Sequence, residues 1–116
     1  MSIGLSGEEL ACSHLRKKGY QIIERNFRCK LGEIDIIALN GDILIFCEVK
    51  TRQNKEFGEP FEAVTTHKQN RLKMIAQFYL LTHPKANNIS NLRFDVLSIL
   101  LNQKGKPEIL HMESAF

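Results

Sequence analysis

Residues 32–52, GEIDIIALNGDILIFCEVKTR, constrain the fold more than any other part of the chain. Two runs of aliphatic and β-branched residues flank Asn40 and Gly41. Asn-Gly is a preferred dipeptide for a two-residue hairpin turn, because both residues tolerate positive φ. The sequence therefore predicts an antiparallel pair of strands at residues 33–39 and 42–51.

The turn also fixes the register of this hairpin, with Leu39 opposite Asp42, Asp35 opposite Phe46 and Glu33 opposite Glu48. One face then carries only apolar residues, Ile34, Ile36, Ala38, Ile43, Ile45, Cys47 and Val49. The other face carries Glu33, Asp35, Ile37, Leu44, Phe46, Glu48 and Lys50. Because this second face is apolar near the turn and charged at its open end, we expect it to be half covered and then to open into a cleft.

The charged end of the hairpin has the donors of a divalent-metal site. Asp35 and Glu48 are diagonal neighbours, with Cα atoms roughly 7 Å apart, so both carboxylates can reach one hard cation. Oxygen ligands favour Mg²⁺ or Mn²⁺ over zinc. With Lys50 on the same face, this group suits metal-assisted hydrolysis of a phosphodiester. The alternative is structural: an ion pair between Glu48 and Lys50 that offsets repulsion between Glu33 and Glu48.

The other segments complete an order αβββαββ, an α/β fold in which a mixed central sheet has a helix on each side. Ser6 and Glu9 have the spacing of a capping box, which predicts a helix that ends near Lys18 and Gly19. A polar loop is predicted at residues 53–59. A second helix is predicted before Pro84, with an apolar face made by Leu72, Ile75, Ala76, Tyr79 and Leu80. The added strands are residues 20–27, 92–101 and 108–112, the last at an edge.

Composition narrows the class of protein. A chain of 116 residues is long enough for one self-sufficient domain, residues 1–116. The start, MSIGLSGEELACSHL, has acids where a signal peptide needs basic residues, and no later segment approaches a membrane span, so we expect a cytoplasmic protein. Cys12, Cys29 and Cys47 are odd in number and lack zinc-like spacing, which predicts reduced thiols.

Residues on either side of the hairpin are candidates for binding a nucleic-acid backbone. They precede the hairpin, follow it, or begin the second helix, whose N-terminus favours phosphate. The set is Arg25, Arg28, Arg52, Lys68, Gln69 and Arg71. Each of them alone is also consistent with a solvated surface residue, and the net charge of +3 does not identify a partner. Asp95 is predicted to anchor Arg93 or a neighbouring helix.

Several motifs together resemble one known family. GEID followed by EVK matches the PD-(D/E)XK nuclease signature, with Asp35 as its aspartate and Glu48 and Lys50 in the E-X-K; Ile34 stands where the signature has proline. The wider set, GEELA, GY, RNFRCKLGEIDIIA, EVKTR, FGEP, AVT and RFDV, resembles the YraN-like family over nearly the full length. That family is similar to archaeal Holliday-junction resolvases. The resemblance implies a restriction-endonuclease-like fold, a homodimer, and Mg²⁺- or Mn²⁺-dependent cleavage of DNA, with branched or single-stranded DNA as candidate substrates.

Glu8 is a further candidate for the site. Its predicted helix face also carries Ala11, Cys12 and Leu15, so Glu8 should face the core and Glu9 the solvent. In resolvase-like relatives a glutamate of this helix joins the metal site, so the resemblance implies Glu8, Asp35 and Glu48 as metal ligands and, with Lys50, as catalytic residues. The plainer alternative is an acid favoured by the helix dipole.

A second class of function stays open from the sequence. The chain is also consistent with a nucleic-acid-binding or adaptor protein that keeps a nuclease scaffold without turnover. Phosphate contacts carry no base information and shape readout leaves no simple motif, so the sequence decides neither the substrate structure nor the oligomeric state.

Overall fold

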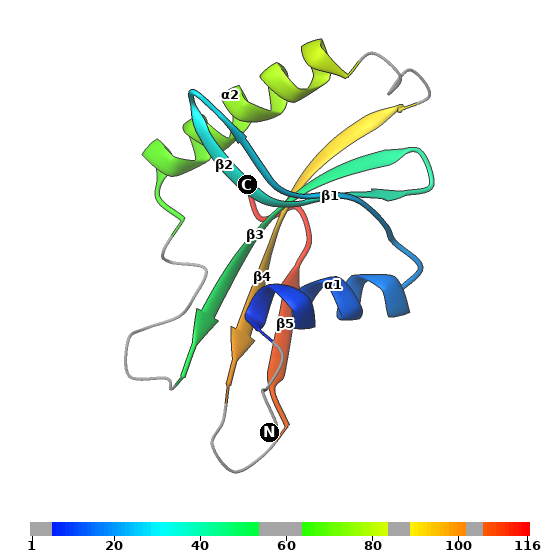
Figure 1. The fold of residues 1–116 in the computed structure, drawn as a ribbon, viewed down its shortest axis with the longest axis vertical. Helices are drawn as coiled ribbons and strands as arrows, with labels where there is room; N and C mark the ends of the chain where they lie inside the picture. Colours follow the sequence, from blue (N-terminus) through cyan, green and yellow to red (C-terminus); the bar gives the residue numbers. More distant parts are fainter. Residues whose placement is uncertain (1–5, 54–63, 84–88, 102–105) are drawn as a thin grey trace.

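A computed structural model describes residues 6–53, 64–83, 89–101 and 106–116. Its elements are α1 (Gly7–Lys17), β1 (Gln21–Cys29), β2 (Gly32–Asn40), β3 (Ile43–Arg52), α2 (Thr66–Thr82), β4 (Asn91–Leu100) and β5 (Glu108–Met112). The strands form one sheet in the order β1-β2-β3-β4-β5. The predicted order αβββαββ and the edge position of the last strand are confirmed (Figure 1). The predicted loop at residues 53–59 lies, apart from Gln53, outside the described residues.

The sheet is mixed because α2 lies in the connection between β3 and β4. These two strands are parallel, whereas β1–β2, β2–β3 and β4–β5 are antiparallel. A parallel pair needs a long crossover, which the segment containing α2 provides. Neither helix of the described residues is long and apolar enough for a membrane crossing.

Each helix covers its own face of the sheet. On the α1 side, Ala11, Cys12 and Leu15 pack against a cluster that includes Ile36, Ala38, Ile45, Cys47, Leu97 and Ile99. On the α2 side, Leu72, Ile75, Ala76 and Tyr79 pack against Ile37, Leu44, Phe46 and Val96. The two predicted apolar helix faces are confirmed, and Cys12 and Cys47 are buried free thiols.

The capping of α1 follows the sequence pattern. Ser6 is the N-cap, and its hydroxyl accepts a hydrogen bond from the backbone N–H of Glu9 at 3.1 Å. The helix gives way to Lys18 as C-cap, and Gly19 follows with φ of 89°. A left-handed residue after the last turn is a common helix stop, so the predicted end of α1 is confirmed.

The hairpin turn between β2 and β3 differs by one residue from the prediction. Asn40 pairs with Ile43, so the two loop residues are Gly41 and Asp42. Asp42 is held in the loop by Ser90, whose backbone N–H and hydroxyl donate to the Asp42 carbonyl and carboxylate. The predicted pairings are therefore wrong: Leu39, for example, lies opposite Leu44 and not Asp42, a shift of two residues along β3. The parity is unchanged, so most side chains keep their predicted face.

Ile34 is an exception to those faces. β2 pairs with β3 from Asn40 only as far as Ile36, whereas its pairing with β1 continues to Gly32. The far end of the β1–β2 hairpin therefore bends toward α2 (Figure 1), where a Cβ on Gly32 would lie 3.2 Å from Ile75 Cδ1. Ile34 packs on the α2 side, so its predicted place on the same face as Ile36 and Ala38 is wrong, because the strand is not flat.

Candidate active site

Asp35 and Glu48 lie where β2 separates from β3. The β2–β3 register ends at Ile36 and Cys47, and one further step would put Asp35 across from Glu48. The backbones of Asp35 and Glu48 do not continue the ladder. The side chain of Asp35 takes over there, and its Oδ2 accepts a hydrogen bond from the Val49 N–H at 2.8 Å. Glu48 is 8% exposed, so the described register holds two carboxylates together in a poorly hydrated place.

The protonation of Asp35 reflects this environment. The pKa of Asp35 is raised to about 7, first by burial and then by the negative charge of Glu48, while the hydrogen bond from Val49 acts in the opposite direction. Burial and a like charge both disfavour the ionised form of a carboxyl. The pair therefore has an affinity for positive charge, whether a proton or a cation.

Two lysines face the same acids. Lys68, in the first turn of α2, places Nζ 3.5 Å from Glu48 Oε1. Burial lowers the pKa of Lys50, and its contact with Lys68 lowers it further. Burial acts to lower the pKa of Lys68 as well, but the contact with Lys50 and the charge of Glu48 outweigh it and raise that pKa. The ion-pair partner of Glu48 in the described chain is thus Lys68, not Lys50 as the structural alternative had it.

Glu8 lies on α1 as predicted but has other partners. Its Oε1 accepts hydrogen bonds from Arg25 Nε at 3.2 Å and Asn26 Nδ2 at 2.9 Å, both on β1. Within the described ranges, no three histidine, cysteine, aspartate or glutamate side chains gather as a metal-binding group. The expected three-carboxylate cluster is therefore not assembled there, because β1 supplies a cation and an amide that hold Glu8. Glu9 is exposed, as expected.

The remaining predicted backbone-binding residues are dispersed. Arg28 is exposed and its Nε binds Glu33 Oε2 at 2.7 Å. Arg71 lies in contact with His67 on the surface of α2. Arg52 is half-buried at the end of β3, and its Nε is a buried donor without a hydrogen-bond partner in the described part of the chain. Of the predicted set, Lys68 is the residue that contacts the acid pair.

A second polar cluster lies on the opposite, α1 side. Asp95 is fully buried and accepts hydrogen bonds from Arg93 Nε and Nη2 at 2.9 Å, His111 Nε2 at 2.7 Å and the Ser114 N–H at 3.1 Å. Burial alone would raise the pKa of Asp95, but the bonds from His111 and Arg93 hold it below its usual value. The prediction that Asp95 anchors Arg93 is confirmed; the sequence carried no signal for His111.

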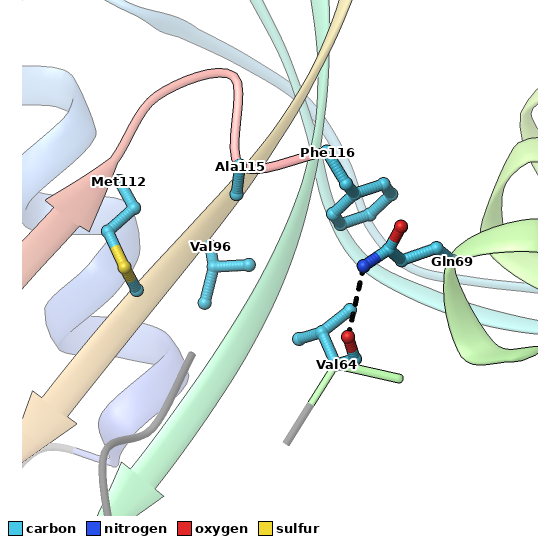
Figure 2. A pocket seen from close by; sticks show the side chains of 6 residues that line it. All are labelled: Val64, Gln69, Val96, Met112, Ala115 and Phe116. Carbon is cyan, nitrogen blue, oxygen red and sulfur yellow. Dashed lines mark hydrogen bonds between the residues drawn. The ribbon is translucent and has the colours of Figure 1, made fainter. Parts of the chain in front are cut away.

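Sequence reasoning also missed a pocket of about 230 Å³ next to the acid pair. Its lining comes from three separate stretches of the chain, and the residues are Val64, Gln69, Val96, Met112, Ala115 and Phe116. Figure 2 shows the amide of Gln69 between the Phe116 ring and Val64, with its Nε2 bonded to the Val64 carbonyl at 3.1 Å. No local motif could have predicted a cavity assembled from residues so far apart in the chain.

The fold and this site define a small mixed α/β protein with a half-buried acid and lysine group on one sheet face. The chain belongs to the uncharacterised protein family UPF0102, whose model matches residues 7–99, and this confirms the YraN-like family recognised from the motifs. A UPF0102 protein of Alkaliphilus oremlandii is 48% identical over 98% of this chain and 97% of its own. One from Dictyoglomus thermophilum is 50% identical over 90% of this chain and 86% of its own.

One solved structure, named "Structure of EndoMS-dsDNA2 complex", is similar to this chain with a TM-score of 0.37 and 16% identity. The similarity covers 90% of this chain and 41% of that one.

Proposed function

We propose that this protein is a metal-dependent DNA endonuclease that hydrolyses phosphodiester bonds, with Asp35, Glu48 and Lys50 at its centre. The observation that carries the proposal is the gathering of two carboxylates and two lysines where β2 leaves β3. Charges placed together with little hydration are costly to the fold unless a ligand compensates them. A divalent cation and a phosphodiester together provide that compensation, and the GEID and EVK motifs support the same chemistry.

Asp35 and Glu48 would hold Mg²⁺ or Mn²⁺. The donors fit such an ion, because they are carboxylate oxygens held side by side with the pKa of one raised to about 7. When bound, the ion would supply positive charge to the scissile phosphate and acidify a water molecule. Glu8 would join these ligands only after release from Arg25 and Asn26.

The lysines take different parts in this proposal. Lys50, whose pKa is lowered by burial and by Lys68, is suited to accept or orient the proton of the attacking water. Lys68 is charged, and it lies at a helix N-terminus whose first turn carries no acid, so it is suited to bind a non-bridging phosphate oxygen. Arg52 and Arg71, with Arg25 and Arg28, would contact the flanking DNA backbone.

The direct test is cleavage of labelled branched, flapped, single-stranded and duplex DNA with Mg²⁺ or Mn²⁺. We expect Asp35→Asn and Lys50→Ala each to lower the cleavage rate at least about 100-fold, the usual effect of removing one acid–base or electrostatic group. Lys73→Ala, which removes an exposed lysine from α2, is the matched control and should retain the wild-type rate. Equal rates for all four proteins would identify a contaminating nuclease and end the proposal.

A nucleic-acid-binding or adaptor role without turnover is the second candidate. The Glu8–Arg25 pair favours it, because it leaves two carboxylates rather than three at the site. Binding that weakens with salt, ignores a chelator and is accompanied by no cleavage of any substrate would support this role.

A further inference from the structure

The pocket described above lies on the same sheet face as the acid pair. Val96 is the register partner of Glu48 across β3–β4, and Met112 is the partner of Val96 across β4–β5. Neighbouring strands are about 4.8 Å apart. The pocket therefore begins one strand away from the carboxylates, a separation that a single nucleotide spans from its phosphate to its base.

The lining has the chemistry of a nucleobase site. Five of its side chains are apolar, and the ring of Phe116 is stacked on Phe94, with centroids 5.2 Å apart. Gln69 Nε2 donates one hydrogen bond to the Val64 carbonyl. A primary amide carries a second N–H and a carbonyl oxygen, which can form hydrogen bonds with the edge of a base. Apolar and aromatic walls with a few polar groups are how proteins hold unstacked bases.

The pocket is also held in shape without a ligand. Its wall at Ala115 and Phe116 is fixed where the Ala115 N–H donates to the Phe94 carbonyl at 2.8 Å. The preceding Ser114 N–H donates to the buried carboxylate of Asp95 at 3.1 Å. The polar cluster on the α1 side thus positions the chain segment that closes the pocket on the α2 side, and a largely preformed cavity is typical of a ligand site.

We infer that this pocket receives an unpaired nucleobase of the strand whose phosphate lies at Asp35 and Glu48. The inference rests on the proposed function, which supplies the position of the phosphate. A base in a duplex must leave its stack and its partner before it can enter such a pocket, whereas a base in a single strand or flap need not. The substrate class is therefore DNA with an unpaired nucleotide beside the bond to be cleaved.

Binding without metal tests the pocket separately from catalysis. The probes are a single-stranded oligonucleotide, the same strand with one abasic position, and its duplex, each measured by fluorescence anisotropy in EDTA. Ala115→Leu adds bulk to the pocket from an exposed position, so it should fold normally. We expect it to weaken single-strand binding roughly tenfold, within the range of base–aromatic stacking, and to leave duplex binding unchanged. Leu110→Ala, which alters an exposed β5 residue outside the pocket, is the control and should change nothing.

The abasic strand, with the abasic position scanned along it, identifies the group that enters. When the abasic position is the one that occupies the pocket, its effect on binding to wild type should equal the effect of Ala115→Leu on binding to the intact strand. Ala115→Leu tested with that abasic strand should bind only a little more weakly than either change alone gives. Gln69→Ala should give a smaller loss in the same direction. Equal losses on single strand and duplex, or no loss with Ala115→Leu, would overturn the inference even if cleavage depends on Asp35. Base-dependent binding in a protein that cleaves no DNA would support the pocket while the endonuclease proposal fails.

Discussion

Asp35 has a protonation state set by its strand neighbours. Its pKa is raised from 3.8 to about 7, first by burial and then by Glu48. Since the unfolded chain has the lower pKa, the folded protein binds this proton more tightly. The stability that the proton confers is fully present below about pH 4 and is lost as the pH rises to about 7.

Removing this charge should therefore have an effect that depends on pH. In EDTA at pH 8, we expect Asp35→Asn to raise the free energy of unfolding by roughly 1–3 kcal/mol, allowing for partial solvent screening. At pH 5 Asp35 is protonated in the folded protein but mostly ionised in the unfolded chain, so only part of this stability is lost and the difference should be clearly smaller than at pH 8. Urea unfolding at both pH values is the measurement, with the exposed Glu108→Gln as the control. A difference of the same size at both pH values would contradict the assigned pKa.

The β1–β2 hairpin approaches α2 closely at Gly32. Gly32 has φ of 138°, and a Cβ there would lie 3.2 Å from Ile75 Cδ1 and 3.4 Å from Arg71 Cδ. Only glycine allows both this conformation and this close approach. A larger residue at Gly32 would push the hairpin away from α2, which carries Lys68 to the acid pair.

We expect Gly32→Ala to lower the free energy of unfolding by about 2–3 kcal/mol, since it adds a steric cost to backbone strain. Gly19→Ala is the matched control, because Gly19 also has positive φ, 89°, but its Cβ would meet nothing within 4 Å. It should cost only about 1–2 kcal/mol. Denaturant unfolding compares the two variants, and equal losses would show that the contact with α2 contributes nothing.

The elements that the sequence predicted well are those fixed by local patterns. The cap at Ser6 and the buried face of α2 each depend on neighbours within one helix. The errors came from distant contacts. The turn shifted by one residue because Ser90, far along the chain, holds Asp42.

The same limit applies to the candidate site. The grouping of Asp35, Glu48 and Lys50 was predictable because strand alternation places the three on one face. The partners of Glu8 were not, because they depend on where β1 passes over α1. The pocket was not predictable either, since only the complete sheet brings Val64, Val96 and Phe116 together.

Across the whole molecule, the two faces of the sheet shift the pKa of their buried acids in opposite directions. On the α1 side, Asp95 is fully bonded by Arg93, His111 and Ser114, and its pKa is lowered. On the α2 side the pKa of Asp35 is raised. An acid whose charge is stabilised by its neighbours supports the fold, whereas a half-buried acid with a raised pKa is a candidate for ligand binding. This contrast supports a structural role for Asp95 and is consistent with the proposed site on the α2 side.

A divalent cation should consequently stabilise the whole protein even when no substrate is present. A ligand bound only by the native state stabilises it by mass action, by about 2.7 kcal/mol at 100 times its Kd. For a domain of this size that corresponds to a rise in Tm of several degrees. We expect Mn²⁺ or Mg²⁺ to produce this rise in wild type, and Asp35→Asn to abolish most of it while being no less stable than wild type in EDTA.

Variants at two neighbouring glutamates of α1 should be measured in the same thermal titration. Glu9 is exposed, so Glu9→Asp keeps the charge and should leave the metal-induced rise in Tm unchanged. Glu8→Gln distinguishes two arrangements: it reduces the rise if Glu8 leaves Arg25 and Asn26 to join the ion, and it leaves the rise intact if β1 retains Glu8. Differential scanning fluorimetry over a range of Mn²⁺ concentrations makes the comparison. If all four proteins shift alike, the cation binds elsewhere, and Asp35 and Glu48 are not its ligands.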